Sequence, residues 1–522
     1  MVAGVELTYN RFASALNMAN TIFGDGVTVT GASFTGDSDA SAIYSDGDTI
    51  SPGVVPGDTG VILSTGDVRA FTSTGPQSNV RSNMTTPNSG PNNHPLFDDI
   101  ATGNTFDASI LEIDFVPDAG VNFITMEFVF SSDEYPEYVG SIYNDIFGVW
   151  INGDYVPLAA GNGEISIGNL NEAGGPNLFH LNTQDQFNTE MDGFTISLSV
   201  VIPVSPGDVN TLQIGITDAG DSAYDSNVLI AADSVQGALV AVNDRVLLRP
   251  GDTKTVDVVA NDLNLTTGSV VITHINDVPV VPGDSVTLTT GQTITLNPDG
   301  TLDMVGNAIS EDVVFTYEIA STTGDTAVGI VTVDTVPCFV VGTMIRTEKG
   351  ERPVETLRIG QHVMTRDDGP QPIRWIGRRV MPAEGPMAPV RIAEGTFGDH
   401  AALTVSPLHR VLVQNAQAEL LFGTHEVLVA ARDLVDGKHV TKLEGGQVEY
   451  VHLLFDRHQV IWSDGLLSES FLPGPQTTHC FDAERIAEIC TIFPELDPKT
   501  GTGYGPAARP ALKSFEARLL VA

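Results

Sequence analysis

Turn-forming residues interrupt most of this chain at short and regular intervals. After residue 22, clusters of Gly, Asp, Ser, Thr and Pro recur about every 8–12 residues, and the stretches between them favour β structure. This spacing is typical of β-sandwiches, in which short antiparallel strands pack as two layers. Residues 8–20 are the exception, because Phe12, Leu16, Met18 and Ile22 recur at helical spacing. The sequence therefore predicts a mainly β protein.

Two β-sandwiches are predicted before residue 337. The first covers residues 1–238, with strands expected at 109–115, 123–130, 146–151, 194–202 and 211–217. The second covers residues 239–336, about 95 residues, which is a typical size for an immunoglobulin-like sandwich. Its strands are expected at 255–259, 269–275, 285–289, 293–296, 313–319 and 329–333.

Charge is divided unevenly at about residue 336. Only six of the 25 Lys and Arg residues precede that point, whereas 43 of the 66 Asp and Glu residues do. The net charge is therefore −37 on residues 1–336 and −4 on the remainder. So acidic a segment repels phosphates, which argues against nucleic acid as a partner. Its acidity is explained either by a solvated surface or by calcium sites, because Ca²⁺ prefers several oxygen ligands.

Cys338, the first of three cysteines, lies at this charge boundary. Residues 1–336 hold no cysteine, so no disulfide stabilises them. Cys480 and Cys490 flank a stretch that is predicted to be helical from residue 482 to about residue 494. Ten helical residues span about 15 Å, which is too far for a disulfide between these two cysteines. All three thiols are therefore expected to be free.

The chain lacks the usual sequence signals for membranes and for Sec-type export. No apolar stretch approaches the roughly 20 residues needed to cross a membrane, so no transmembrane segment is expected. The first residues lack a basic region followed by an apolar core, so no Sec-type signal peptide is recognised.

Three sequence blocks follow one another from Cys338 onward. The first covers residues 338–345 and continues at 350–360, the second covers 403–413, and the third covers 449–461. Together they resemble the blocks of Hint domains, the autoprocessing modules shared by hedgehog proteins and inteins. The resemblance implies an all-β, horseshoe-like domain over residues 337–475, followed by a short helix and a tail over residues 476–522.

The resemblance also implies residues with roles in cleavage. Cys338 is expected to attack the carbonyl carbon of Pro337 and to convert that amide into a thioester, chemistry that needs no cofactor. His409 is the expected proton donor, and Ser406, which stands at a threonine position of the family, is expected to hold the scissile group. His458 is expected to activate a second nucleophile.

Some features of this region restrict the reaction. Inteins end in a His-Asn pair, but no Asn follows His458 at the corresponding place, so cleavage or transfer to an external nucleophile is expected instead of splicing. Pro337 has a crowded and rigid carbonyl, which slows attack. Five other histidines are expected to be structural or exposed: His362, His400, His425, His439 and His452.

Residues 128–138, 143–148 and 216–226 form a second set of blocks, in the N-terminal part. They are similar to those of the choice-of-anchor L domain, a bacterial extracellular β-sandwich. This resemblance implies a secreted or cell-surface protein with an extracellular or surface partner of unknown identity. Asp218, Asp221 and Asp225 are spaced to converge in one turn, where they either bind Ca²⁺ or cap the turn.

The second sandwich begins at Asn243-Asp244, and residues 258–262 follow with Asp262. This pattern resembles bacterial cadherin-like or immunoglobulin-like repeats, and the resemblance implies that Asp244 and Asp262 bind Ca²⁺ at a module junction. Two functions are therefore predicted. The first is a surface or secreted protein that processes itself at Cys338. The alternative is a non-enzymatic, calcium-dependent adhesin or matrix protein in which the Hint fold is only structural.

Overall fold

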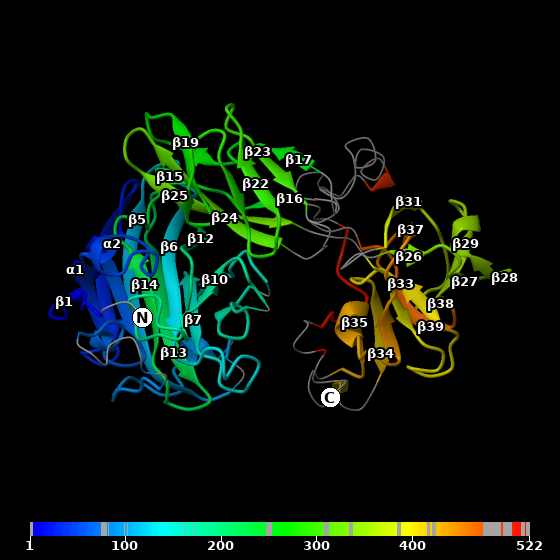
Figure 1. The fold of residues 1–522 in the computed structure, drawn as a ribbon, viewed down its shortest axis with the longest axis horizontal. Coiled ribbons are helices and arrows are strands. Elements are labelled where there is room, and N and C mark those ends of the chain that lie inside the picture. Colours follow the sequence, from blue (N-terminus) through cyan, green and yellow to red (C-terminus); the bar gives the residue numbers. More distant parts are fainter. Residues whose placement is uncertain are drawn as a thin grey trace. The chain divides into compact units, whose positions relative to one another are not determined.

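The protein was analysed as a computed structural model, and the residues it describes fall into two compact units (Figure 1). The first unit comprises Met1–Asp244, Lys254–Met304 and Val313–Thr332, and the second comprises Arg245–Thr253, Val305–Asp312 and Val333–Ala522. The described residues are 4–74, 81, 83–98, 100, 101, 103–161, 163–172, 174–246, 253–306, 313–333, 338–383, 388–414, 418, 419, 424–472, 492, 493, 504–512 and 517.

Two antiparallel sheets form the N-terminal sandwich. The eight-stranded sheet has the order β1 (Thr8–Asn10), β3 (Ser41–Ser45), β4 (Gly60–Ser64), β14 (Ser226–Ala231), β6 (Phe123–Ser132), β11 (Gly193–Thr195) and β10 (Phe179–Leu181), and β12 (Leu198–Pro203) also pairs with β6. The six-stranded sheet has the order β2 (Val27–Thr35), β5 (Thr105–Pro117), β13 (Asn210–Ala219), β7 (Ile146–Ile151) and β8 (Asp154–Tyr155), and β9 (Ile165–Ser166) also pairs with β7.

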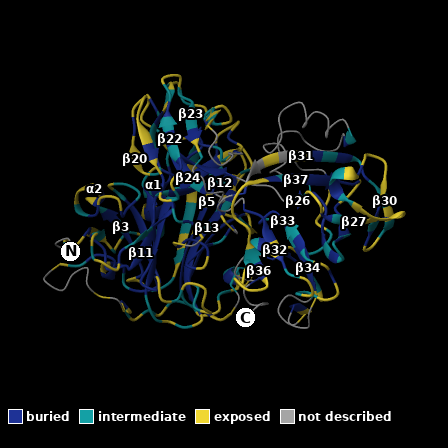
Figure 2. Ribbon diagram, turned by 45° about the vertical axis from the view of Figure 1, so that its right-hand side comes forward, coloured by how far each residue is buried: buried dark blue, intermediate teal, exposed yellow. Residues whose placement is uncertain are grey.

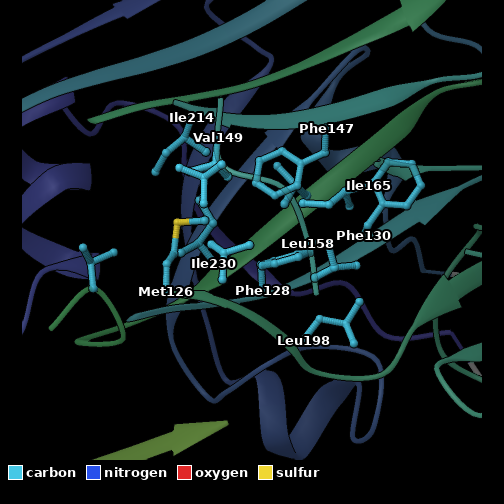
Figure 3. Close-up of a cluster of buried hydrophobic side chains, with 14 of the residues drawn as sticks. Met126, Phe128, Phe130, Phe147, Val149, Leu158, Ile165, Leu198, Ile214 and Ile230 are labelled. Atoms are coloured by element: carbon cyan, nitrogen blue, oxygen red, sulfur yellow. The ribbon is translucent and has the colours of Figure 1, made fainter. Parts of the chain in front are cut away.

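Strand β6 shows why these residues form a central strand. Its even-numbered side chains, from Ile124 to Phe130, lie in the core between the two sheets, where Phe128 packs against Phe147 of β7 with ring centroids 5.0 Å apart. Figure 3 shows this core, with Met126, Phe128 and Phe130 facing Phe147, Val149 and Ile214. Val129 points the other way into a second apolar cluster, so the middle of the strand is buried on both faces.

The helix near the N-terminus is shorter than the sequence predicted. Helix α1 covers Ala15–Ile22 and begins where the side chain of Ser14 accepts a hydrogen bond from the amide of Asn17. Met18 and Ile22 are buried as expected, but Phe12 is 95% exposed and lies outside the helix. The prediction of helix from residue 8 is therefore wrong, because residues 8–10 instead pair with β3 as an edge strand.

The remaining helices in the described residues are short. They are α2 (Gly47–Ile50) and the 3₁₀ turns Val68–Ala70, Pro95–Phe97, Val354–Thr356 and Ala431–Leu434.

The second sandwich is built from two small sheets and a two-stranded pair. The five-stranded sheet has the order β16 (Asp244–Val246), β25 (Thr326–Val333), β24 (Val313–Ser321), β19 (Val270–Ile275) and β20 (Val278–Pro279). The four-stranded sheet has the order β17 (Thr253–Val256), β23 (Leu302–Val305), β22 (Thr293–Leu296) and β21 (Ser285–Thr287). The pair is β15 (Leu239–Val240) with β18 (Leu263–Asn264).

The second unit contains two further sheets. The six-stranded sheet has the order β31 (Trp375–Pro382), β37 (Gln447–Leu454), β26 (Phe339–Val340), β33 (Leu403–Val405), β32 (Val390–Ile392) and β36 (Val440–Lys442). The eight-stranded sheet has the order β28 (Gly350–Pro353), β27 (Met344–Thr347), β29 (His362–Thr365), β38 (Val460–Ser463), β39 (Leu466–Glu469), β34 (Arg410–Gln414) and β35 (Glu426–Ala430), and β30 (Gly369–Pro372) also pairs with β29.

The prediction of a mainly β chain is confirmed. In each unit the buried residues gather along the strands and the exposed residues gather in the connecting loops (Figure 2). The strand expected at 194–202 is divided in two, because β11 ends at Thr195 and β12 begins at Leu198. The predicted helix over 482–494 lies largely outside the described residues, as do Cys480 and Cys490.

Candidate active site

Cys338 lies directly before β26, the central strand of the six-stranded sheet. It forms no disulfide with a described residue, and it is only 4% exposed. Its neighbours in the apolar cluster include Trp375, Tyr450 and Phe471. Burial, and then the neighbouring Cys338, raise the pKa of Tyr450, so this phenol stays neutral. The thiol is therefore held in a dry pocket of large side chains.

Ser406 contacts Cys338 as the sequence predicted. Strand β26 pairs with β33, with Phe339 opposite Val405, so the residues that flank this pair also meet. The amide nitrogen of Cys338 donates to Ser406 Oγ at 2.7 Å, and the amide of Ser406 donates to the carbonyl oxygen of Cys338 at 2.9 Å. The nitrogen of the Pro337–Cys338 bond therefore has a hydroxyl partner.

His452 contacts Cys338, and the sequence did not indicate this contact. It lies on β37, which pairs with β26 on the side opposite to β33, and its Nε2 is 3.4 Å from Cys338 Sγ. Like Cys338 it is buried, with 2% of its surface exposed. The sequence assigned His452 only a structural or exposed place, and the structure puts it in contact with the thiol. The signal that could have found it is the two-residue alternation of the strand, which places Tyr450 and His452 on the same face.

His409 follows Ser406 in the turn before β34. Its amide donates to the carbonyl of Ser406 at 3.0 Å, and its ring packs on Phe339 with centroids 4.3 Å apart. Neither ring nitrogen has a hydrogen-bond partner within the described part of the chain. Burial lowers the pKa of His409 to about 4 although Glu469 raises it, so the ring is neutral at physiological pH.

His458 is placed differently from what the sequence suggested. Its Nε2 is 3.1 Å from the carbonyl oxygen of Ser470 and 3.4 Å from Glu469 Oε2, and its Nδ1 accepts from the amide of Ala508 at 3.0 Å. His458 is also among the groups that lower the pKa of His409. None of these contacts involves Cys338, so the role of His458 in activating a nucleophile stays a prediction. Pro337, the expected acyl donor, lies outside the described residues.

The three acids expected to converge in the N-terminal sandwich do not form a metal site. Over the described ranges, no group of three or more His, Cys, Asp and Glu side chains is placed to hold a metal ion. Asp221 caps its own turn by accepting from the amide of Ala223 at 3.0 Å, and Asp225 accepts from the amide and hydroxyl of Thr86 at 3.0 and 2.6 Å. Asp218 is buried at the end of β13. Turn capping therefore explains Asp221, whereas Asp225 holds a distant loop through Thr86.

Asp244 and Asp262, in contrast, are brought together around Tyr317. The Tyr317 hydroxyl donates to Asp262 Oδ1 at 3.0 Å, and the amide of Val242 donates to the same atom at 2.7 Å. Burial, followed by the charge of Asp262, raises the pKa of Asp244 to about 8, and burial raises that of Asp262 to about 6. One buried oxygen of each carboxyl group has no hydrogen-bond partner in the described residues.

Several further acids are buried in the N-terminal sandwich. Asp133, Glu134, Asp145 and Asp218 are each no more than 2% exposed. Burial is the largest cause that raises the pKa of all four, to about 8 for Asp133, about 10 for Glu134 and about 7 for Asp145. None of them takes part in an ion pair with another described residue.

The fold and these contacts define a multidomain β protein whose last domain begins at a buried cysteine with a histidine and a serine partner. Residues 337–475 match the family model of the Hint domain, and residues 8–236 match that of the choice-of-anchor L domain. The chain therefore contains a choice-of-anchor L domain and a Hint domain. No curated protein sequence matches the chain.

Three solved structures are similar to parts of the chain. The gp41-1 intein is 8% identical, with a TM-score of 0.17, and the match covers 26% of this chain and 98% of the intein. The M60 catalytic domain with the CBM51-1 and CBM51-2 domains of Clostridium perfringens ZmpB is 13% identical, with a TM-score of 0.13, covering 70% and 34%. The N-terminal eight Ig domains of Down Syndrome Cell Adhesion Molecule are 9% identical, with a TM-score of 0.15, covering 70% and 40%. None of these TM-scores establishes a shared fold.

The choice-of-anchor L domain indicates a surface or secreted protein. In the part of the chain that the structure describes, no helix is both long enough and apolar enough to span a membrane.

Proposed function

We propose that this surface or secreted protein cleaves itself at the Pro337–Cys338 bond through its Hint domain. The observation that carries the proposal is that both reacting atoms of Cys338 have a polar side-chain partner. Sγ lies 3.4 Å from His452 Nε2, and the amide nitrogen lies 2.7 Å from Ser406 Oγ. A nucleophile within reach of a base, with its leaving nitrogen held by a hydroxyl, is the arrangement that acyl transfer requires.

The first step is a transfer of the acyl group from nitrogen to sulfur. His452 takes the thiol proton, and the thiolate attacks the carbonyl carbon of Pro337. The C–N bond breaks, a C–S bond forms, and the proton ends on the new amino group of Cys338. Ser406 holds that nitrogen during the change, and neutral His409 shuttles the proton from the buried turn beside Phe339.

The second step breaks the thioester. Water or an external nucleophile attacks the same carbonyl carbon, and the thiol of Cys338 leaves. The products are a fragment of 337 residues and a fragment of 185 residues that begins with Cys338. The C-terminal fragment keeps all of the described contacts between Cys338, Ser406 and His452.

The experiment is intact mass spectrometry of the full chain during incubation with a thiol. Wild type should yield the two fragments, and Cys338→Ala should stay whole. His452→Gln should slow cleavage, whereas His439→Gln, which changes a histidine with a 55% exposed side chain, should not. Hydroxylamine should trap the thioester as a hydroxamate on the larger fragment. If the wild-type chain stays intact on prolonged incubation, the proposal is refuted.

A second candidate function is calcium-dependent adhesion, with the Hint domain as a structural part. The observation that favours it is the pair of carboxyl groups of Asp244 and Asp262, each with a buried oxygen that has no partner in the described residues. Calcium binding to the folded state should raise the melting temperature of wild type by mass action. Asp262→Asn should remove that shift, while the exposed Asp118→Asn should keep it. Calorimetric titration without any binding heat would exclude a calcium site at this pair.

A further inference from the structure

A segment beyond the matched Hint region returns to that domain. Residues 504–512, which we call the C-terminal strap, lie against β35 and the loop after β37. Leu428 of β35 pairs in parallel with Ala511, donates its amide to the carbonyl of Pro510 and accepts from the amide of Leu512, both at 2.8 Å. Tyr504 donates its buried hydroxyl to the carbonyl of Phe455 at 2.6 Å. The strap is thus hydrogen-bonded at both of its ends.

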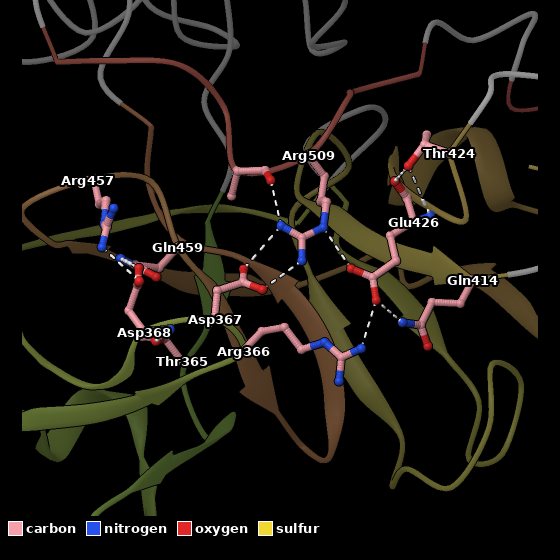
Figure 4. Close-up of polar contacts among 11 residues, drawn as sticks. Thr365, Arg366, Asp367, Asp368, Gln414, Thr424, Glu426, Arg457, Gln459 and Arg509 are labelled. Atoms are coloured by element: carbon pink, nitrogen blue, oxygen red, sulfur yellow. Dashed lines mark hydrogen bonds and ion pairs between the residues drawn. The ribbon is translucent and has the colours of Figure 1, made fainter. Parts of the chain in front are cut away.

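Arg509 anchors the middle of the strap by charge (Figure 4). Its guanidinium donates to Glu426 Oε2 at 2.7 Å and to the two carboxylate oxygens of Asp367 at 2.7 and 3.1 Å. Burial alone would raise the pKa of Glu426, but hydrogen bonds from Arg366, Arg509 and Gln414 lower it. Glu426 is therefore ionised, and a planar guanidinium that bridges two carboxyl groups is a specific contact.

The residue before this anchor reaches the Hint site. The amide of Ala508 donates to His458 Nδ1 at 3.0 Å, and the His458 side chain is fully buried. A backbone N–H can only donate, so Nδ1 must keep its lone pair. The ring is then neutral with its proton on Nε2, which faces the carbonyl oxygen of Ser470 at 3.1 Å and Glu469 Oε2 at 3.4 Å.

The charge state of His458 matters to its surroundings. Buried Glu469 also lies 3.4 Å from Arg410 Nη1, which compensates its charge while His458 is neutral. Burial lowers the pKa of His409, Glu469 raises it, and Arg410 and His458 lower it. If the strap leaves, Nδ1 loses its donor, and no backbone amide then fixes the ring proton on Nε2.

We propose that the C-terminal strap is a positioning element of the Hint site, in which the Ala508 amide, anchored by Arg509, fixes His458 as the neutral imidazole protonated on Nε2. The assignment of the tautomer stands without any cleavage. The effect of the strap on cleavage rests on the proposed self-cleavage, because in that reaction His458 acts only through its electrostatic effect on His409. The strap thus makes residues after the matched Hint region part of the site.

The test measures the tautomer directly in the full chain, with Cys338→Ala so that the chain stays intact. Long-range nitrogen–proton correlation spectra of protein labelled with ¹⁵N-histidine report the protonation of each ring nitrogen, and His458→Gln identifies the signals that belong to His458. With the strap docked, Nδ1 should give the shift of an unprotonated acceptor and Nε2 that of a protonated nitrogen throughout the neutral pH range.

Matched variants then remove the donor or the anchor. Ala508→Pro deletes the N–H that reaches His458, and Arg509→Ala deletes the anchor, so both should change the nitrogen shifts of His458 away from those of the wild-type tautomer. Ala507→Pro is the control, because no hydrogen bond from its amide is present among the described residues. Arg509→Lys keeps the charge but not the planar fork that bridges Glu426 and Asp367, so it should restore the wild-type signal only in part.

Unchanged His458 signals in both Ala508→Pro and Arg509→Ala overturn the proposal, and so does an equal change in Ala507→Pro. If Arg509→Ala unfolds the domain, as judged by tryptophan fluorescence, the result for Ala508→Pro alone decides whether the proposal holds. The same variants with Cys338 restored are then followed by mass spectrometry. If the wild-type chain is not cleaved, the proposed function is refuted but the tautomer assignment still stands. If the variants change the tautomer but not the cleavage rate, the strap has no effect on the reaction.

Discussion

Asp133, at the end of β6, should make the first unit less stable as the pH rises. Burial raises the pKa of this carboxyl from 3.8 to about 8, and the charges of Asp192 and Asp225 raise it further, against a hydrogen bond from the amide of Met84. Because the pKa is raised in the folded state, the native chain holds a proton that the unfolded chain has lost between about pH 4 and pH 8. The stability that this group contributes is full below its unfolded pKa and disappears as the pH rises through the folded one.

The magnitude follows from the size of the shift. Each pKa unit corresponds to about 1.4 kcal/mol, so the free energy of unfolding should fall by on the order of 5 kcal/mol across this window. That loss is comparable to the whole stability of a typical domain, which is about 5–15 kcal/mol. Asp133→Asn retains an acceptor for the amide of Met84 but cannot ionise, so its stability should depend less steeply on pH by about 1.4 kcal/mol per pH unit.

The assay is hydrogen–deuterium exchange of peptides from β6, measured by mass spectrometry in EDTA and corrected for the intrinsic pH dependence of exchange. The protection of these peptides should fall with pH in wild type and fall less steeply in Asp133→Asn. The control is Asp118→Asn, which replaces an exposed acid of the same unit and should behave like wild type. Equal slopes in Asp133→Asn and wild type, or protection that rises with pH in wild type, would refute the reasoning.

Three other outcomes are expected. Replacing His452 with Gln should slow the proposed cleavage about 10²–10⁴-fold, the usual contribution of a general base, as measured by the rate of fragment formation. Phe128→Ala should destabilise the first unit by about 3–5 kcal/mol, because it opens a cavity between the two sheets, and urea unfolding followed by peptide exchange should show no change in the second unit. Glu469→Gln should cost the second unit about 3–5 kcal/mol, because Arg410 loses its buried partner. Burial alone would raise the pKa of Glu469, but His458 and Arg410 lower it. The stability that ionised Glu469 contributes is therefore present above its unfolded pKa and is lost as the pH falls. Circular dichroism of wild type and variant as a function of pH tests whether stability falls in this direction.

Two strands were predicted with the bounds that the structure shows. The strand expected at 146–151 coincides with β7, and that expected at 293–296 coincides with β22. The start of the first helix was predicted wrongly, because the spacing of Phe12 and Leu16 fits a helix but neither residue is buried. Helical spacing indicates a helix only where the apolar face has something to pack against, and that depends on the rest of the fold.

The candidate site divides in the same way. Ser406 was chosen from a family block, and the structure places its hydroxyl beside the amide of Cys338, whereas its role in cleavage stays a prediction. His452 lies in the third sequence block, but the sequence assigned it no part in cleavage, because the two residues that make its contact with Cys338 are 114 residues apart in the chain. The contact of Ala508 with His458 spans 50 residues and uses a backbone amide, which no side-chain pattern can reveal.

The sequence by itself determined the β architecture, the charge boundary near residue 336, the domain resemblances and the choice of Cys338 as the nucleophile. These properties depend on local alternation, on turn residues and on short blocks, all of which are written in consecutive residues. Only the tertiary structure decided that His452 lies beside the thiol, that Asp225 bonds to Thr86 while Asp221 caps its own turn, and that the strap reaches His458. The reason is physical: hydrogen-bond partners, burial and pKa shifts depend on which strands become neighbours, and neighbours in a sheet are chosen by the whole fold.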